Sequence, residues 1–250
     1  MKSKRIEEIE NYIIETGNVS YDELIQKYKV SLNTLRRDIN ELVKKGNIEK
    51  VYGGVRSVQD VLVDYEIRNT INQELKKKIG ASAALLINEG DIIFIDSGTT
   101  TVQLLPFLDK NIHCTILTNN FDVVDFCTHY PQFDVFIVGT HYRFSTRSFV
   151  EISNQDLDSI NINKAFMAAT GISIQNGLTN SDVLEQQIKR KICQKSREIY
   201  LLADHTKFGH TTLMTYSSLE SVYTVISDKN LSDEYLQFFK EHNIQFLTGE

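Results

Sequence analysis

From residue 92 onward, short apolar runs alternate with helical segments, and this pattern restricts the fold more than any other feature of the chain. Each run has the length of a strand and is bounded by turn residues. Such alternation predicts an open, mostly parallel sheet covered by helices on both faces, a Rossmann-like α/β domain. The predicted strands are Ile92–Ile95, Thr115–Leu117, Val135–Val138, Ala165–Ala169, Ile199–Leu202, Val222–Ile226 and Ile244–Leu247, and the predicted helices are Ile71–Ile87, Val102–Leu108, Asp182–Ser196 and Asp233–His242.

The loop after the first predicted strand is rich in small hydroxyl residues and leads directly into a helix. Ligands of open α/β sheets bind at the carboxyl ends of strands. A turn of this kind directs backbone N–H groups, hydroxyls and a helix dipole at one point, which suits a phosphate. Walker A and dinucleotide-binding patterns are absent, and a plain turn capped by Ser and Thr is the alternative. The predicted anion-binding loop consists of Asp96, Ser97, Gly98, Thr99, Thr100 and Thr101.

More polar residues are predicted at the same edge of the sheet. Asp204 and Lys207 follow the strand Ile199–Leu202, and they would supply a carboxylate for sugar hydroxyls and an ammonium for a phosphate. The alternatives are a turn-capping carboxylate and an exposed lysine. Glu185 and Lys189 lie four apart on a predicted helix, where they could equally form an exposed salt bridge. Beyond the loop, the predicted effector-binding residues are Thr118, Asn119, Asn120, Arg143, Glu185, Lys189, Asp204 and Lys207.

The first 46 residues form a helix-turn-helix pattern of three helical segments. Gly17 favours the end of the first helix, Ser20 and Glu23 form a capping box for the second, and Ser31 caps the third. Gly46 follows lysines in the last turn of the third helix. The residues predicted to face the core are Ile6, Ile9, Ile13, Ile14, Leu24, Ile25, Tyr28, Leu35, Ile39 and Leu42.

With Leu35 and Ile39 inward, the third helix presents donor-rich side chains to solvent at its N-terminal end. Arginine bridges two acceptors of guanine, and asparagine does the same for adenine. An ordinary solvated helix face is the alternative, but the place of Arg36-Arg37 in a three-helix unit favours DNA. The hairpin that follows forms a wing, in which Gly53-Gly54 supply the positive φ angles of a tight turn. The predicted DNA-binding residues are Ser31, Asn33, Thr34, Arg36, Arg37, Lys50, Tyr52, Gly53 and Gly54.

These motifs resemble the DeoR family of transcriptional regulators over roughly residues 3–228. The resemblance implies a winged helix-turn-helix joined to a sensor domain with a fold similar to sugar-phosphate isomerases and coenzyme-A transferases. It also implies a phosphorylated sugar or sugar-derived effector, and it favours a repressor. The matching segments are Val30–Gly46 with Thr34 and Arg36-Arg37-Asp38, Gly53-Gly54, Arg68, Asn72, Lys76, Asp96–Thr101, Thr118–Asn120, Gly171-Ile172, Gly177–Thr179, Glu185, Lys189 and Ala203–Gly209.

The sequence departs from the family pattern at five positions. Tyr52 replaces the usual His before the glycine pair, Thr140 and Glu151 replace glycines, Asn163 replaces an Asp and Gln186 replaces an Ala. If the segment 140–151 borders the pocket, we expect these changes to alter effector choice or to weaken binding.

Charge is unevenly distributed along the chain, whose net charge is −6. Residues 1–56 hold 11 Lys+Arg and 9 Asp+Glu (11 − 9 = +2), and the remainder holds 16 and 24 (16 − 24 = −8). A weakly basic head permits DNA binding there. No apolar run of about 18 residues and no signal-peptide pattern is found, so we expect a cytoplasmic protein that does not contact a membrane.

No cofactor or metal is expected. Cys114, Cys127 and Cys193 are odd in number and widely spaced, which predicts buried thiols rather than disulfides or a zinc site. His205 and His210 lie near Asp204 without a companion His/Cys cluster.

The sequence predicts a winged helix-turn-helix at residues 1–57, a linker and approach helix at 58–74, and a sensor domain at 75–250. We expect a homo-oligomer, a dimer or tetramer, that binds double-stranded operator DNA. The alternative is a sugar-phosphate isomerase-like enzyme with an accessory DNA-binding head, in which Asp96, Glu185, Asp204 and Lys207 supply acid–base groups. A DNA-binding head is an unusual attachment for an isomerase, which favours the regulator.

Overall fold

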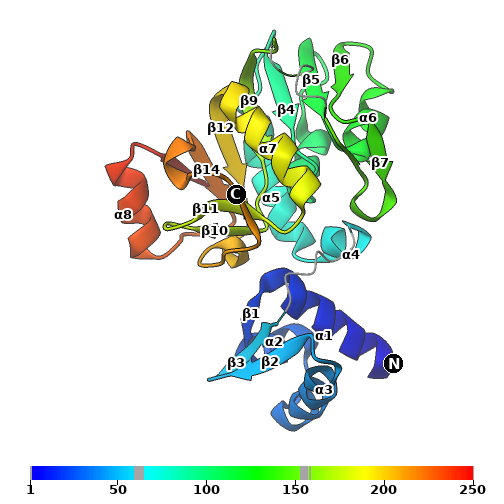
Figure 1. The fold of residues 1–250 in the computed structure, drawn as a ribbon, viewed down its shortest axis with the longest axis vertical. Coiled ribbons are helices and arrows are strands. Elements are labelled where there is room, and N and C mark those ends of the chain that lie inside the picture. The colour runs from blue at the N-terminus through cyan, green and yellow to red at the C-terminus, as the bar shows by residue number, and fades with distance from the viewer. Residues whose placement is uncertain (1, 59–64, 153–156, 158, 250) are drawn as a thin grey trace. The chain divides into compact units, whose positions relative to one another are not determined.

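The computed structural model describes residues 2–58, 65–152, 157 and 159–249. Its contacts divide the chain into an N-terminal unit, residues 1–71, and a C-terminal unit, residues 72–250 (Figure 1). Of the predicted linker and approach helix at residues 58–74, residues 59–64 lie outside the described residues. No helix in the described part of the chain is both long and apolar enough to cross a membrane.

The N-terminal unit combines three helices with a small antiparallel sheet of order β1-β3-β2. A further short helix, α4, belongs to the same unit. The strand β1 was not predicted, whereas α4 lies within the predicted linker and approach helix at residues 58–74. In chain order the elements are α1 (Lys2–Thr16), β1 (Asn18–Ser20), α2 (Tyr21–Tyr28), α3 (Leu32–Lys45), β2 (Ile48–Val51), β3 (Gly54–Ser57) and α4 (Tyr65–Thr70).

Local capping explains where these helices begin and end. Ser20 Oγ accepts from the Glu23 N–H at 3.2 Å, and Ser31 Oγ accepts from the Thr34 N–H at 3.3 Å, which confirms both predicted N-caps. The Glu23 carboxylate, expected to complete the capping box, instead accepts from the Tyr12 hydroxyl at 2.6 Å. Gly46 ends α3 with a φ of 87°. The fully buried residues of the core are Ile9, Ile13, Leu24, Leu35, Ile39, Leu42 and Val55.

The C-terminal unit is built on a seven-stranded sheet in which every pairing is parallel. The order is β15-β14-β12-β9-β4-β5-β6, so the chain moves outward from β4 in one direction and later returns to its other side at β9. The boundary between β4 and β9 is the topological switch point, where such sheets bind ligands. The strands are β4 (Ile92–Ile95), β5 (Cys114–Thr118), β6 (Phe133–Ile137), β9 (Ile162–Met167), β12 (Ser196–Leu202), β14 (Thr224–Ser227) and β15 (Gln245–Thr248). They confirm the predicted α/β fold class.

Helices cover both faces of this sheet (Figure 1). One face packs against α7 (Val183–Lys195) and α8 (Asp233–Glu241). The other packs against α5 (Gln73–Ala84), α6 (Phe121–Cys127) and the 3-10 helix η1 (Thr101–Phe107). The remaining elements are the hairpin β7 (His141–Arg143) and β8 (Ser148–Val150), the antiparallel strands β10 (Gly171–Ser173), β11 (Gly177–Asn180) and β13 (Met214–Ser217), and the 3-10 turns η2 (Phe144–Thr146), η3 (His205–Lys207) and η4 (Leu219–Ser221).

Two predicted helices differ from the structure. The helix expected over residues 71–87 begins only at Gln73, because Asn72 adopts a left-handed φ of 55° and separates it from α4. The segment expected as a helix over 102–108 is a 3-10 helix with Pro106 inside it. Proline lacks the N–H that an α-helical ladder needs and is tolerated in such a short, tighter turn.

Candidate functional site

The predicted recognition helix is α3, whose N-terminal end is exposed. Asn33, Arg36 and Arg37 are exposed, and within the described residues neither arginine forms a hydrogen bond or ion pair. Thr34 is half-buried, and its hydroxyl lies 3.0 Å from Ser31 Oγ. The structure therefore leaves both guanidinium groups available to a partner, as a DNA-reading helix requires.

An ion pair that sequence analysis missed holds α3 against α1. Asp38 is 1% exposed and accepts from Arg5 Nε at 2.9 Å and from Arg5 Nη2 at 2.8 Å. The carboxylate therefore orients α3 and is not available to DNA. The signal was present in the sequence as the Asp of the Arg-Arg-Asp run, an acidic residue within a helix otherwise suited to an anionic partner.

The wing is the β2–β3 hairpin, and its two glycines have different roles. Gly53 has a φ of +76° and lies in open space, whereas Gly54 does not have a positive φ, so the expectation that both supply positive φ angles is wrong. A Cβ on Gly54 would lie 2.3 Å from the carbonyl oxygen of Val19 on β1, so close strand pairing requires glycine there. Tyr52 is fully exposed at the tip, and Lys50 Nζ donates to Asn40 on α3 at 2.5 Å.

In the C-terminal unit, the predicted anion-binding loop follows β4 at the switch point. Asp96 is fully buried, and its Oδ2 accepts from the Ala168 N–H, just beyond β9, at 2.9 Å. The same oxygen forms an ion pair with Lys189 of α7, whose ammonium also donates to the Ala168 carbonyl at 3.0 Å. The Thr101 hydroxyl donates to the Asp96 carbonyl at 2.7 Å. Asp96 thus joins β4, β9 and α7 at one point.

Glu185 is buried and does not pair with Lys189, so the alternative of an exposed salt bridge is wrong for these two residues. Its Oε1 accepts from the Ser148 hydroxyl at 3.1 Å and from the Ser97 hydroxyl at 3.4 Å. Its Oε2 accepts from the Asn180 amide at 3.3 Å. The carboxylate therefore ties the loop after β4 to β8 and β11, segments far apart in the sequence.

The residues after β5 are also buried, and they shape the backbone next to the loop. The Thr118 hydroxyl donates to the Ile95 carbonyl at 2.7 Å, and Asn120 Oδ1 caps α6 by accepting from the Asp122 N–H at 2.8 Å. Asn119 lies between them and is fully buried. Thr99, Thr100 and the rest of the loop apart from half-buried Gly98 are buried as well.

After β12, Asp204 and Lys207 occupy the turn η3. Asp204 Oδ1 accepts from the Thr206 N–H at 3.0 Å, so this carboxylate does cap a turn, as the alternative held. Lys207 is 6% exposed and is not the exposed cation of the alternative. Asp228 pairs with His205 Nδ1 at 2.8 Å, and although burial raises the pKa of Asp228, the hydrogen bonds from His205 make its net shift downward.

Four buried polar atoms at this edge have no hydrogen-bond partner within the described residues. Leaving such an atom unsatisfied costs about 1–3 kcal/mol. Native proteins contain few of them, and each calls for a ligand, water or ion. The atoms are Asp96 Oδ1, Asn119 Oδ1, Asn120 Nδ2 and Asp204 Oδ2, from the ends of β4, β5 and β12.

The departures from the family pattern have individual explanations. Asn163 Oδ1 accepts from the Ile92 N–H at 2.7 Å, and Gln186 Nε2 donates to the Thr215 carbonyl at 2.9 Å, so both are structural. Arg143 is not one of these departures but a predicted effector-binding residue, and it forms an ion pair with Asp182, the N-cap of α7. Glu151 is exposed with a left-handed φ of 63°, a conformation that glycine adopts without cost.

Among the described residues, no group of three or more His, Cys, Asp or Glu side chains could hold a metal ion. The three cysteines are buried free thiols, as predicted. Burial raises the pKa of Cys114 to about 11 and that of Cys127 to about 12, which makes them poor nucleophiles at neutral pH.

Comparison with known families decides between the regulator and the enzyme. The DeoR-like helix-turn-helix domain matches residues 5–61, and the DeoR C terminal sensor domain matches residues 71–229. The chain belongs to the DeoR family. It is a DNA-binding transcriptional regulator, and the isomerase-like enzyme is not favoured.

Two relatives and one solved structure show how far the similarity of this DeoR-family chain extends. The HTH-type transcriptional regulator IolR of Bacillus subtilis (strain 168) is 48% identical over 246 residues, covering 98% of each chain. The lactose phosphotransferase system repressor of Staphylococcus epidermidis is 32% identical over 236 residues, covering 92% of this chain and 93% of that one. Ribose 5-phosphate isomerase A of Methanocaldococcus jannaschii has a TM-score of 0.41 at 17% identity, covering 55% of each chain.

Proposed function

We propose that the chain represses a sugar-metabolism operon and that a phosphorylated sugar controls its affinity for operator DNA. One observation carries the proposal: within the described residues, the chain combines a helix with two unpaired, exposed arginines and a buried polar edge with four unsatisfied atoms. The names of its relatives, a transcriptional regulator and a repressor of a sugar transport system, support it.

The roles proposed for the N-terminal unit follow from exposure. Arg36 and Arg37 read base edges from α3, with Asn33 and Thr34 beside them, while the wing contributes backbone contacts. Residues 1–57 bind DNA, residues 58–74 connect the DNA-binding domain to the sensor domain, and residues 75–250 sense the effector. Such a protein works in the cytoplasm, where operator DNA is.

The roles proposed at the sensing site follow from its unsatisfied atoms. The loop between Asp96 and Thr101 holds the phosphate through N–H and hydroxyl groups, and buried Lys207 neutralises it. The free oxygens of Asp96 and Asp204 accept from sugar hydroxyls, and the Asn120 amide donates to a sugar oxygen. Glu185 and Lys189 position the loop.

The proposed switch is a difference in effector affinity between two arrangements of a homo-oligomer, a dimer or tetramer. Helix-turn-helix proteins read two half-sites with two copies of the head. The effector therefore lowers DNA affinity if it binds more tightly to the arrangement in which the two DNA-binding domains are not spaced to reach both half-sites of the operator.

Fluorescence anisotropy with a duplex from upstream of the protein's own gene tests DNA recognition. Arg36→Ala and Arg37→Ala are expected to lose about 1–3 kcal/mol of specific binding, a drop of about 5- to 150-fold in affinity. Lys50→Ala is expected to weaken all sequences alike and to reduce the salt slope by about one unit. Arg190→Ala removes an exposed arginine of the C-terminal unit and is the matched control. Specific binding that survives in both α3 variants would rule out the assigned recognition helix.

A thermal-shift panel tests the effector class. Pentose and hexose phosphates are expected to stabilise the protein and to change its anisotropy titration with DNA, whereas the unphosphorylated sugars are not. Asp204→Asn is expected to reduce the shift, because its amide places a donor where the carboxylate accepts. If sugars and sugar phosphates raised the melting temperature equally, the proposed anion-binding site would be contradicted.

A further inference from the structure

A buried lysine outside the predicted effector set reaches the anion-binding loop. Lys76, in the first turn of α5, is 1% exposed, and its ammonium donates to the Thr99 hydroxyl at 2.9 Å. Burying an ammonium is costly unless polar or anionic groups surround it. Thr99 accepts this bond, so its own hydroxyl proton remains to be donated elsewhere. An anion bound by the Thr99 hydroxyl would therefore lie next to the ammonium as well.

Close backbone packing fixes the position of Lys76 relative to the loop. Gly80 lies one turn further along the same face of α5. A Cβ on it would lie 2.4 Å from the carbonyl carbon of Gln103 and 2.8 Å from the nitrogen of Leu104, both in η1. Since η1 follows the loop directly, α5 and the loop move together as one packed body.

The N-terminal end of α5, which carries Lys76, is two residues from Ile71 in the core of the N-terminal unit. The Lys76 N–H donates to the Asn72 carbonyl at 3.0 Å, so the first turn of α5 is built on Asn72. Asn72 has a left-handed φ of 55°. Before it, Ile71 belongs to the buried core of the N-terminal unit, and Ile67 of α4 packs against that core. Asn72 is therefore the joint between a helix anchored in one unit and a helix anchored at the loop of the other.

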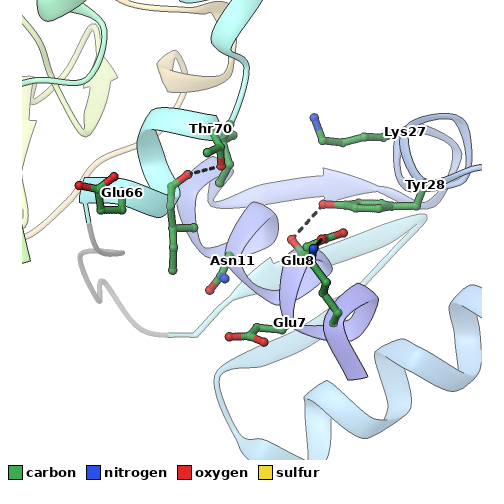
Figure 2. A pocket seen from close by; sticks show the side chains of 10 residues that line it. Glu7, Glu8, Asn11, Lys27, Tyr28, Glu66 and Thr70 are labelled. Carbon is green, nitrogen blue, oxygen red and sulfur yellow. Dashed lines mark hydrogen bonds and ion pairs between the residues drawn. The ribbon is translucent and has the colours of Figure 1, made fainter. Parts of the chain in front are cut away.

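The packing of α4 against α1 and α2 leaves a pocket between the three helices. A pocket of about 560 Å³ lies between α4, α1 and α2, lined by Glu7 of α1, Tyr28 of α2 and Glu66 of α4, among others (Figure 2). The Tyr28 hydroxyl donates to the Glu8 carbonyl, and so ties α2 to α1 and not to α4 (Figure 2). An element with a hollow beside it can shift at lower cost than one packed on every side.

We propose that Lys76 is a ligand for the phosphate group of the effector, and that it transmits occupancy of the site through Asn72 to α4 and hence to the DNA-binding unit. The inference rests on the proposed function and adds to it a binding residue and a route. When the phosphate is bound, Lys76 and the first turn of α5 are restrained, and Asn72 passes that restraint to α4. When the site is empty, the joint is free to adopt other angles.

Titration of the full-length chain with inorganic phosphate, followed by thermal shift, tests the binding role. Lys76→Met is expected to weaken phosphate binding at least about tenfold, the loss of one charge-assisted hydrogen bond. Lys77→Met is the matched control, because Lys77 is the next residue and forms a local ion pair with Glu74. Lys76→Arg keeps the cation and is expected to restore part of the affinity. It also keeps the test decisive if the Met variant fails to fold. Phosphate affinity unchanged in both Lys76 variants would overturn the binding role.

DNA anisotropy with and without inorganic phosphate tests the transmitting role. Asn72→Gly tolerates the same positive φ but loosens the joint, so we expect normal phosphate binding and at least a twofold smaller effect of phosphate on DNA affinity. A full response in this variant would overturn the proposed route while leaving the proposed function intact. A wild-type chain whose DNA affinity does not respond to phosphate or to any sugar phosphate would instead refute the proposed function, and the inference with it.

Discussion

Asp38→Asn is the change that most directly tests how α3 is held in place. In the native chain one carboxylate oxygen accepts two hydrogen bonds from Arg5, at 2.9 and 2.8 Å, and the Asp38 side chain is 1% exposed. The substitution keeps the shape of the side chain but removes its charge. The guanidinium then faces a neutral amide that can accept only through its carbonyl oxygen.

The size of the effect follows from burial. Removing one partner of a fully buried ion pair costs about 3–5 kcal/mol, and a hydrogen bond to a charged group contributes about 1.5–3 kcal/mol. The Arg5 side chain is 30% exposed, so water compensates part of the loss. We therefore expect the opening free energy of the N-terminal unit to fall by about 2 kcal/mol, which is about a 30-fold increase in opening.

Hydrogen exchange of the full chain, read by mass spectrometry, measures the opening free energy of individual segments. Peptides from α1 and α3 are expected to exchange about 30-fold faster in Asp38→Asn, while peptides from the C-terminal sheet remain unchanged. Glu41→Gln is the matched control, because the Lys2–Glu41 ion pair joins the same two helices but is exposed at both ends. We expect it to cost under about 1 kcal/mol. Equal effects of the two variants would refute the argument that burial of Asp38 makes its ion pair important.

Two further predictions concern the wing and the sensing edge. Gly54→Ala is expected to destabilise the N-terminal unit by about 1–3 kcal/mol, because the new Cβ would lie 2.3 Å from the Val19 carbonyl oxygen. Gly53→Ala would place its Cβ within 4 Å of no other atom and would only strain the backbone φ. Hydrogen-exchange rates of the β1 amides compare the two variants. Burial, and then Lys207, lower the pKa of His210 below 6.5. Neutral His210 therefore does not reduce the free energy of unfolding above pH 6.5, and this free energy falls as the pH drops below 6.5, because the unfolded chain then binds the proton more readily. NMR titration should show this low pKa rising when phosphate is added, and a pKa at or above 6.5 in the free protein would contradict it.

Much of the fold could be predicted because its signals are local. The caps at Ser20 and Ser31 and the terminal glycine of α3 depend on residues within one helical turn, and the structure has each of them. The strands of the large sheet are short apolar runs, and central strands such as β4, β5 and β14 are buried on both faces, so the sequence also predicted their positions. Their alternation with helices then left a parallel sheet as the expected architecture.

Local signals failed where a short segment has two possible structures. Nothing in the periodicity of residues 71–87 indicated that Asn72 would take a left-handed φ, since asparagine is compatible with either conformation. The strands β1, β7, β8, β10, β11 and β13 are three or four residues long and are held by their partners rather than by their own pattern. Their existence depends on what lies beside them.

The sequence by itself determined the family, the fold class and the set of polar residues that gather at the carboxyl edge of the sheet. Only the tertiary structure decided how those residues are paired: Lys189 with Asp96, Glu185 with three donors from other segments, and Lys76 with Thr99. The reason is physical. The end of a strand can be predicted from the residues of that strand. The partner of a buried charge depends instead on which distant segments the packed core brings within about 3 Å of it, and the sequence pattern does not contain that distance.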